Sequence, residues 1–154
     1  WNNFLKMLDG NLPEPLVVDP DARPPRLQPN EGKPAAAYRY MRRVHRANGQ
    51  PYCVIDVYLA QHCYEMAPEA FDTQMVIPQL GKVAGDRLQK MTQSFRITTA
   101  DLTVARFLDL PVGAPIGEVR RIITDKDGVV LYLGSGQYRG DLVVFNTTLE
   151  VPTE

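Results

Sequence analysis

The segment Asp125–Phe145, "DKDGVVLYLGSGQYRGDLVVF", determines how the rest of the chain is interpreted. Asp127-Gly128 is typical of a hairpin turn, because glycine adopts the positive φ that tight turns need without a steric penalty. A run of β-branched and aliphatic residues follows, and a second run begins after Tyr138-Arg139-Gly140-Asp141. The segment therefore predicts a turn, a strand, a sharp break and another strand.

Further strand patterns lie on both sides of this segment. Asn48-Gly49 separates two runs rich in Tyr, Val and Ile, which predicts a second hairpin. Strands are predicted over residues 35–46, 50–60, 86–97, 114–124, 129–138 and 142–150. No regular crossover helix separates them, so a doubly wound parallel sheet is disfavoured. The pattern indicates an α+β domain, an antiparallel six-stranded sheet flanked by helices.

Helical patterns occupy three stretches. Residues 61–71 and 73–83 carry short ones that are interrupted by prolines, and residues 98–110 carry the clearest one. In that last stretch Thr98 and Asp101 have the spacing of an N-cap and its partner three residues into the helix. Apolar residues that follow at helical spacing predict a stripe that faces a core.

The first part of the chain differs in composition from the rest. Residues 11–34 hold seven of the thirteen prolines, which remove backbone donors and restrict their neighbours. We expect an extended arm or linker with no packed element there, and a domain boundary near Pro34. Residues 1–34 are then the arm, and residues 35–154 the folded domain. The helix-like "WNNFLKML" at Trp1 suggests a fragment whose upstream part is missing.

Composition narrows the function classes. The 154 residues carry a net charge of −1, which argues against non-specific nucleic-acid binding by the chain itself. No apolar run is long enough to span a bilayer, and no signal-peptide pattern is present. Cys53 and Cys63 lack metal-ligand spacing and disulfide density, so we expect reduced packing residues in a cytoplasmic protein.

Motifs of catalysis and metal binding are absent from the sequence. There is no phosphate-binding glycine loop before a helix, no H-E-x-x-H and no nucleophile elbow. Gly134-Ser135-Gly136 is better interpreted as a kink or bulge that lets strands curve. His45 and His62 lie on different predicted elements and form no metal constellation. We therefore expect no cofactor, no metal and no catalytic residue.

The basic strand "YRYMRRVHR" is the more informative stretch. Because strand side chains alternate, Arg39, Met41, Arg43 and His45 share one face. Three interpretations remain open: a solvated face paired with acidic neighbours, a nucleic-acid surface, or a cradle in which Arg43 and His45 bind an anion. The cradle is chemically reasonable, since guanidinium binds carboxylate or phosphate through two parallel charge-assisted bonds.

The sequence Tyr138-Arg139-Gly140-Asp141 allows three interpretations as well. As an adhesive tripeptide it would need a secreted protein, and nothing in the sequence indicates secretion. As a structural motif it gives Gly140 a sharp bend and lets Arg139 pair with Asp141. As a binding motif it directs the Tyr138 hydroxyl into a pocket. The last two are compatible.

The order of these pieces resembles the UTRA domain, the effector-binding half of HutC-like GntR transcription regulators. The resemblance rests on several motifs together: paired basic positions before the N-G-x-P turn, "A-D-x-x-x-A-x-x-L", "L-P-x-G-x-P", "V-x-R", "D-x-D-G" and "Y-R-G-D". It covers residues 35–150. It implies a chorismate-lyase-like fold, a small-molecule pocket, a homodimer and an N-terminal winged helix-turn-helix that binds DNA. The proline arm would then be the linker to that missing domain.

The resemblance also implies ligand-binding residues. Arg43 and His45 match an Arg-x-Arg pair that grips phosphate or carboxylate in the family, with His45 in place of the second arginine. Thr98 and Thr99 would lie at a helix N-terminus, where free backbone donors favour an anion. Arg139 and Asp141 would be structural or lie at the pocket rim.

Two further positions bear on the ligand. Tyr138 matches the pocket tyrosine of the family, and Tyr132 stands where sugar-binding members often carry a glutamate. With Tyr132 and His45 at these positions, a small carboxylate with an apolar or aromatic body is favoured over an amino-sugar phosphate.

Two other functions remain possible on sequence grounds. A chorismate-lyase-like enzyme acting on an aromatic carboxylic acid is compatible with the implied fold, with Glu118 and Asp141 as the only nearby carboxylates. We interpret both as structural. The second possible function is a dimerisation module whose pocket is vestigial and binds no ligand.

Overall fold

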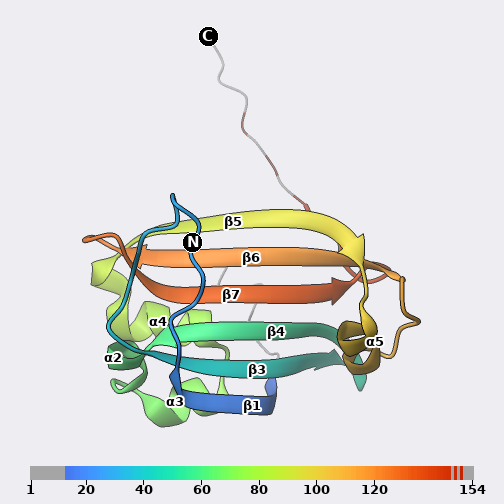
Figure 1. Cartoon of the computed structure of the whole chain (residues 1–154), viewed down its shortest axis with the longest axis horizontal. Helices are drawn as coiled ribbons and strands as arrows, with labels where there is room; N and C mark the ends of the chain where they lie inside the picture. The colour runs from blue at the N-terminus through green and yellow to red at the C-terminus, as the bar shows by residue number, and fades with distance from the viewer. Residues whose placement is uncertain (1–12, 147, 149, 151–154) are drawn as a thin grey trace.

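A computed structural model of the chain describes residues 13–146, 148 and 150, and one curled sheet dominates it. The strands are β1 (Pro13–Ala22), β2 (Lys33–Pro34), β3 (Tyr38–Ala47), β4 (Gln50–Ala60), β5 (Leu88–Thr99), β6 (Pro115–Asp125) and β7 (Val129–Arg139). The spatial order is β1-β3-β4-β7-β6-β5, with every neighbouring pair antiparallel (Figure 1). The short β2 pairs with β7 in parallel. The predicted α+β class with an antiparallel sheet is confirmed.

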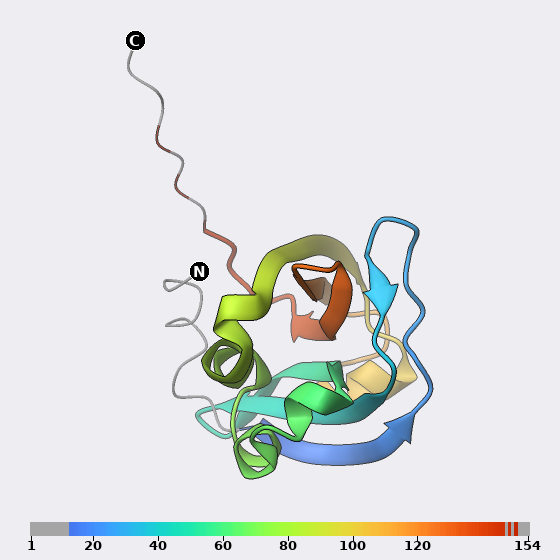
Figure 2. The ribbon, with the colours of Figure 1, turned by 90° about the vertical axis from the view of Figure 1, so that its left-hand side faces the viewer.

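Short helices pack on both faces of this sheet. They are α2 (Gln61–Tyr64), α3 (Pro68–Thr73), α4 (Val76–Ala84), the 3-10 turn η1 (Gly85–Arg87) and α5 (Leu102–Leu108). Helices α2 to α4 gather at one end of the sheet and α5 lies at the other (Figures 1 and 2). We call the face that packs against α2 to α4 the inner face and the face that packs against α5 the outer face.

The sheet has seven strands and not the predicted six. Five of the six predicted strands are confirmed, and the prediction of a strand over 142–150 is wrong for its described part. After Arg139, the N–H groups of Leu142 and Val143 both bond to the Arg139 carbonyl, so the chain turns away from the sheet. Residues 142–146 then run on without strand pairing, while 147 and 149 lie outside the described residues.

The additional strands, β1 and β2, come from the proline-rich arm. The prediction that this arm contributes no packed element is wrong for residues 13–22, which pair with β3 along the edge of the sheet. Proline is compatible with an edge strand, because the missing N–H faces outward, and register shifts in β1 accommodate the remaining mismatch. Farther along, Glu31 pairs with Arg120 of β6 at 2.7 Å. The helix-like residues 1–8 lie outside the described part of the chain.

Helix α5 begins later than its sequence pattern predicts. Its N-cap is Asp101, whose side chain accepts a hydrogen bond from the Val104 N–H at 2.8 Å. The predicted cap at Thr98 is wrong, because Thr98 pairs with Ile116 inside β5. A carboxylate at the N-cap both satisfies a free donor and faces the positive end of the helix dipole, so Asp101 is the better cap.

Both predicted hairpins form. Asn48 and Gly49 have φ of 50° and 77°, the two positive values that a tight two-residue turn requires. At the second hairpin the Asp125 carboxylate accepts the N–H groups of Asp127 and Val129, each at 2.9 Å. Here the loop has three residues between β6 and β7, with Gly128 at a φ of 77°.

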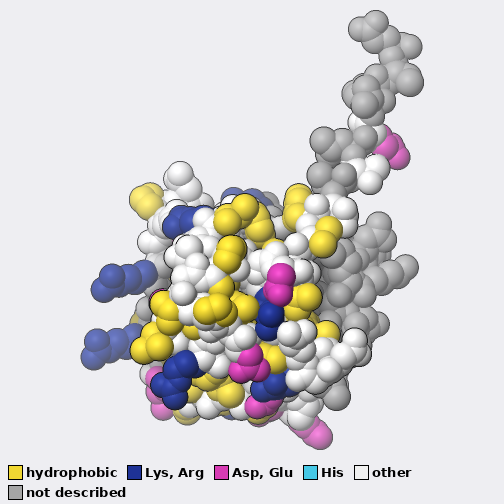
Figure 3. Space-filling view, turned by 90° about the vertical axis from the view of Figure 1, so that its right-hand side faces the viewer, with side chains coloured by type: hydrophobic (Ala, Val, Ile, Leu, Met, Phe, Trp, Pro, Cys, Tyr) yellow, Lys and Arg dark blue, Asp and Glu magenta, His cyan; other side chains and the backbone are white. Residues whose placement is uncertain are grey.

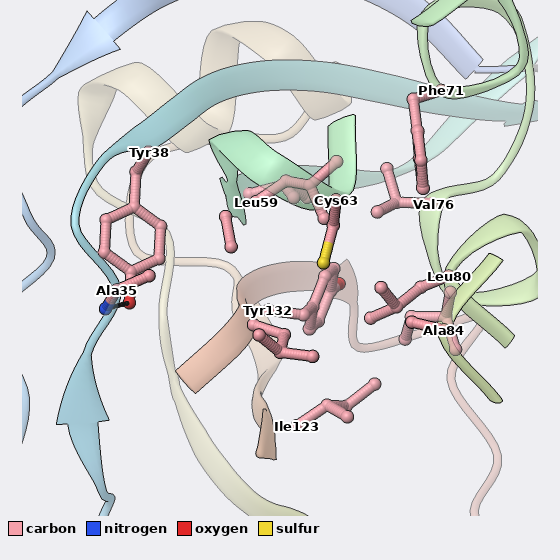
Figure 4. Packing of buried hydrophobic residues seen from close by; sticks show 14 of the residues in the cluster. Ala35, Tyr38, Leu59, Cys63, Phe71, Val76, Leu80, Ala84, Ile123 and Tyr132 are labelled. Carbon is pink, nitrogen blue, oxygen red and sulfur yellow. Dashed lines mark hydrogen bonds between the residues drawn. The ribbon is translucent and has the colours of Figure 1, made fainter. Parts of the chain in front are cut away.

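The main core lies between the inner face and helices α2 to α4 (Figure 4). Apolar side chains of the sheet meet those of the helices there, among them Leu59, Ile123, Phe71, Leu80 and Tyr132. Cys63 belongs to this core, and both cysteines are buried free thiols, as predicted for packing residues.

Tyrosines and glycines alternate along the inner face of β7. Tyr132, Gly134, Gly136 and Tyr138 point to the same side, because strand side chains alternate. A methyl group on Gly134 would overlap the hydroxyl and ring of Tyr132, and one on Gly136 would lie 3.0 Å from the Tyr138 ring. The two glycines therefore leave the space that both tyrosine rings occupy.

A Gly134→Ala substitution should lower stability. The added methyl overlaps buried Tyr132, whose ring cannot move without disturbing the core, so we expect a loss of about 1–3 kcal/mol in the free energy of unfolding. Urea denaturation measures it. Ser135→Ala, on the opposite face of the same strand, is the matched control and should change stability little. Equal stability of the two variants would contradict the packing described.

Candidate functional site

A cavity of about 670 Å³ lies on the inner face of the sheet. Side chains of β3 to β7 form its floor and walls, the α3–α4 connection borders one side, and residues 142–146 border another. Across the floor, Ile55 of β4 and Val119 of β6 both lie opposite Gly136 of β7. Its volume is within the range of small-molecule sites, roughly 300–1,000 Å³.

A β-bulge brings an additional aromatic side chain into the cavity. His45 pairs with Cys53 while Arg46 pairs with Pro51, so Tyr52 is an extra residue in β4. As a result the consecutive residues Tyr52 and Cys53 both line the cavity, which regular alternation would prevent. Burial raises the pKa of the Cys53 thiol to about 12, so this cysteine is a protonated wall residue and no nucleophile.

Arg43 lies in the wall with 3% of its surface exposed. Its guanidinium donates to the Gln74 carbonyl at 2.8 Å and to the Phe71 carbonyl. Among the described residues no carboxylate lies within ion-pair distance of it. Burial lowers the Arg43 pKa from its usual value, yet guanidinium stays protonated in proteins. The cavity wall therefore carries a buried positive charge with no described carboxylate bonded to it, although the charge of Asp72 nearby favours the protonated form.

His45 is the next inward-facing residue of β3, and 4% of its surface is exposed. Its Nδ1 has no hydrogen-bond partner among the described residues. Burial, together with the positive charge of Arg43, lowers the pKa of His45 from 6.5 to about 4. At neutral pH His45 is therefore an uncharged imidazole beside a permanent cation.

A second arginine reaches the cavity from β6, and our sequence analysis missed it as a site residue. Arg121 donates to Oε1 of Gln93 at 2.6 Å and to the Tyr138 hydroxyl at 3.4 Å, and all three side chains line the cavity. Burial raises the pKa of Tyr138 above its usual value, so its hydroxyl stays protonated. The "V-x-R" motif contained Arg121, but only the strand register shows that it faces Tyr138.

The charges around the cavity have one sign. Among the described residues that line it, two are arginines and none is aspartate or glutamate. Glu118 sits between the inward-facing Val119 and Gly117 in alternation, so it belongs to the outer face. The described part of the cavity lining is therefore suited to an anion.

The structure brings four of the predicted ligand-binding residues together: Arg43, His45, Tyr132 and Tyr138 all line the cavity. Thr98 and Thr99 do not. Both belong to β5, paired with Ile116 and Pro115, and not to a helix N-terminus.

The predicted rim residues lie outside the cavity lining as well. Arg139 forms a two-bond ion pair with Asp141, at 3.0 Å for each bond, and donates to the Leu108 carbonyl at the end of α5. Gly140 bonds through its N–H to the Pro115 carbonyl, and a side chain there would collide with it. The motif therefore has the structural role: it joins β7, α5 and the start of β6.

The described residues contain no group of three or more His, Cys, Asp or Glu side chains that could hold a metal ion. No described helix has the length and apolar character needed to cross a bilayer.

An antiparallel sheet with a few covering helices and a cationic cavity on one face is typical of small ligand-binding domains. The UTRA domain family matches residues 25–143, and the chain belongs to this family. No curated protein matches the sequence significantly. Family membership supports a ligand-binding regulatory domain.

Solved structures with this fold come from bacterial regulators. YydK of Bacillus subtilis, a possible transcriptional regulator, has a TM-score of 0.74 at 16% identity, over 94% of this chain and 64% of that chain. The effector domain of PhnF from Mycobacterium smegmatis has a TM-score of 0.72 at 15% identity, over 92% of this chain and 88% of that chain. A GntR-family transcriptional regulator of Enterococcus faecalis has a TM-score of 0.71 at 15% identity, over 89% of this chain and 99% of that chain. At these identities the likeness establishes the fold. The chain thus spans 64% of the length of YydK.

The His45 pKa predicts how stability depends on pH. Below pH 6.5 the unfolded chain binds a proton at His45 that the folded cavity rejects until about pH 4, so stability falls as pH drops through this window. The loss between pH 7.5 and pH 5 should be about 2 kcal/mol. Urea denaturation at each pH measures it. In His45→Gln this part of the pH dependence should vanish; an unchanged slope would contradict a neutral, buried His45.

Proposed function

We propose that the chain is the effector-binding and dimerisation domain of a bacterial HutC-type GntR transcription regulator. A small anionic effector binds in the cavity and modulates DNA binding by a separate winged helix-turn-helix domain. Residues 13–22 and 33–34 are strands of the sheet, so the linker to that domain lies on the N-terminal side of β1. The single observation that carries the proposal is the cavity itself, large enough for a metabolite and positively charged without any described carboxylate in its wall.

The effector is a small carboxylate with an apolar or aromatic body, in preference to a phosphorylated sugar. Tyr52, Tyr132, Tyr138 and Phe95 give the cavity several aromatic walls that suit a flat, apolar group. His45 contributes no charge at neutral pH, since its pKa lies near 4. A sugar ring would instead need several hydrogen-bonding side chains to replace its water, and the aromatic walls supply few.

In a homodimer, the ligand can change the relative arrangement of the two subunits. Ligand binding shifts the population of two dimer arrangements, and the linker transmits this shift to the DNA-binding domains. A coupling free energy of roughly 1–3 kcal/mol is the usual scale, and a few charge-assisted bonds formed in one arrangement supply it. Apolar side chains are visible on the face at the α5 end of the molecule (Figure 3). Leu102 of α5 and Val112 of the loop after it are exposed, which is compatible with a face that a second copy covers.

Ligand-induced thermal stabilisation tests effector binding. A screen of small carboxylates, phosphorylated sugars and amino acids should find a carboxylate that raises the melting temperature, since a ligand at 100 times its Kd adds about 2.7 kcal/mol to the folded state. Arg43→Ala should abolish this stabilisation. Arg46→Ala is the matched control, because Arg46 lies on the same strand but is exposed and pairs with Glu14 at 2.8 Å. Equal stabilisation of both variants would remove Arg43 from the site.

The alternative of a chorismate-lyase-like enzyme makes an opposite prediction. Proton transfer needs an acid or base beside the substrate; no described lining residue is a carboxylate, and His45, with a pKa near 4, is a weak base. Incubation of the purified chain with chorismate, followed by absorbance or chromatography of the aromatic product, should therefore show no turnover above the rate without protein. Turnover that is lost in Arg43→Ala would replace the regulator by an enzyme.

A further inference from the structure

Arg43 has contacts in two directions. Its side chain lines the cavity, and its guanidinium holds the main chain at the end of α3. The Phe71 carbonyl belongs to the last turn of α3, where carbonyls have no partner within the helix, and the Gln74 carbonyl follows directly after. The Arg43 side chain, which comes from strand β3, therefore acts as a C-terminal cap of helix α3.

The segment that Arg43 holds is part of the cavity wall. Met75, Val76 and Ile77 follow Gln74 immediately, and all three line the cavity. Gln79 adds a bond from its Nε2 to Oε1 of Gln74 at 2.6 Å. The position of this α3–α4 connection, which we define as residues 74–77, thus depends on two carbonyl bonds from Arg43.

A different arginine holds α3 itself. Arg39 pairs with Asp72 at 3.2 Å and stacks over the Tyr64 ring at 4.0 Å. Asp72 also accepts the Tyr64 hydroxyl at 2.8 Å. None of these three side chains lines the cavity. A ligand in the cavity therefore leaves this attachment intact while it reaches Arg43.

The acceptors now bonded to Arg43 are the carbonyls of Phe71 and Gln74 and the Met41 sulfur at 3.2 Å, and all three are uncharged. The bonds from Arg43 to these carbonyls are charged on the donor side only, whereas a carboxylate adds a full negative charge and accepts two parallel N–H bonds at once. An anion in the cavity is consequently a better partner for Arg43 than the carbonyls of Phe71 and Gln74. Because the wall has no described carboxylate, nothing else in it competes for this charge.

We propose that an anionic ligand draws the Arg43 guanidinium away from the Phe71 and Gln74 carbonyls and thereby releases the α3–α4 connection. This inference rests on the proposed function and names how ligand binding changes the protein. Arg39 keeps α3 attached through Asp72, so the released segment is limited to residues 71–81, from the last turn of α3 through the connection into α4. Arg43 is a latch with two positions, one for the empty cavity and one for the filled cavity.

Amide hydrogen exchange of the wild-type chain tests the latch without any variant. Benzoate and inorganic phosphate serve as probes, and calorimetry under the same conditions establishes whether either binds. With a bound probe, amides of residues 71–81 should exchange about fivefold faster or more, the effect of losing roughly one hydrogen bond's worth of stability. Amides of α5, on the outer face, serve as the internal control and should not change.

Two variants complete the test. Arg43→Gln should show the fast exchange over residues 71–81 without a probe and no further change with one, whereas Arg46→Gln should behave as the wild type does. A probe that binds while residues 71–81 exchange more slowly or at an unchanged rate would overturn the latch and leave the proposed function standing. Binding of neither probe, nor of any compound in the carboxylate screen, would overturn both.

Discussion

The buried charge of Arg43 is the constraint on which the rest of the site depends. Taking a guanidinium out of water is costly, and proteins usually offset this cost with a carboxylate. In this domain the main-chain carbonyls of Phe71 and Gln74 accept hydrogen bonds from the guanidinium, and the cavity lies beside it. The low pKa of His45 follows from the same charge and the same burial. One side chain thus sets the polarity of the cavity, the protonation of its neighbour and the position of the α3–α4 connection.

The cavity wall formed by β7 depends on glycine at two inward positions, over which the rings of Tyr132 and Tyr138 lie. Gly134 and Gly136 leave room for the rings of Tyr132 and Tyr138, and the neighbouring strands contribute mainly apolar groups at the same level. A regular sheet with a large side chain at each of these positions would fill the space. Because Gly134 and Gly136 let the two tyrosine rings lie close to β7, the space above the rings stays open as part of the cavity.

Much of the fold could be predicted from local chemistry. Asn48-Gly49 and Asp127-Gly128 marked both hairpins, because positive φ is a property of single residues and needs no tertiary information. The arm was misjudged, since prolines that weaken a central strand are acceptable at an edge, and a sequence does not show where the edge is. The last apolar run was misjudged for the converse reason: its composition suits a strand, but the turn after Arg139 directs it off the sheet. At the site, alternation put Arg43 and His45 on one face, and both line the cavity, whereas Tyr138 was expected there from the family resemblance. Alternation could not place Tyr52 or Arg121, which depend on a bulge and on cross-strand register.

Adjacent residues of β6 give the sheet a further property. Arg121 projects toward the cavity, while Arg120 projects to the outer face and binds Glu31 and the Arg26 carbonyl. The backbone between them is a single peptide unit. A rotation of β6 about its own axis would therefore move both guanidiniums together. The cavity on the inner face and residues 26–31 on the outer face are thus mechanically connected through this one strand.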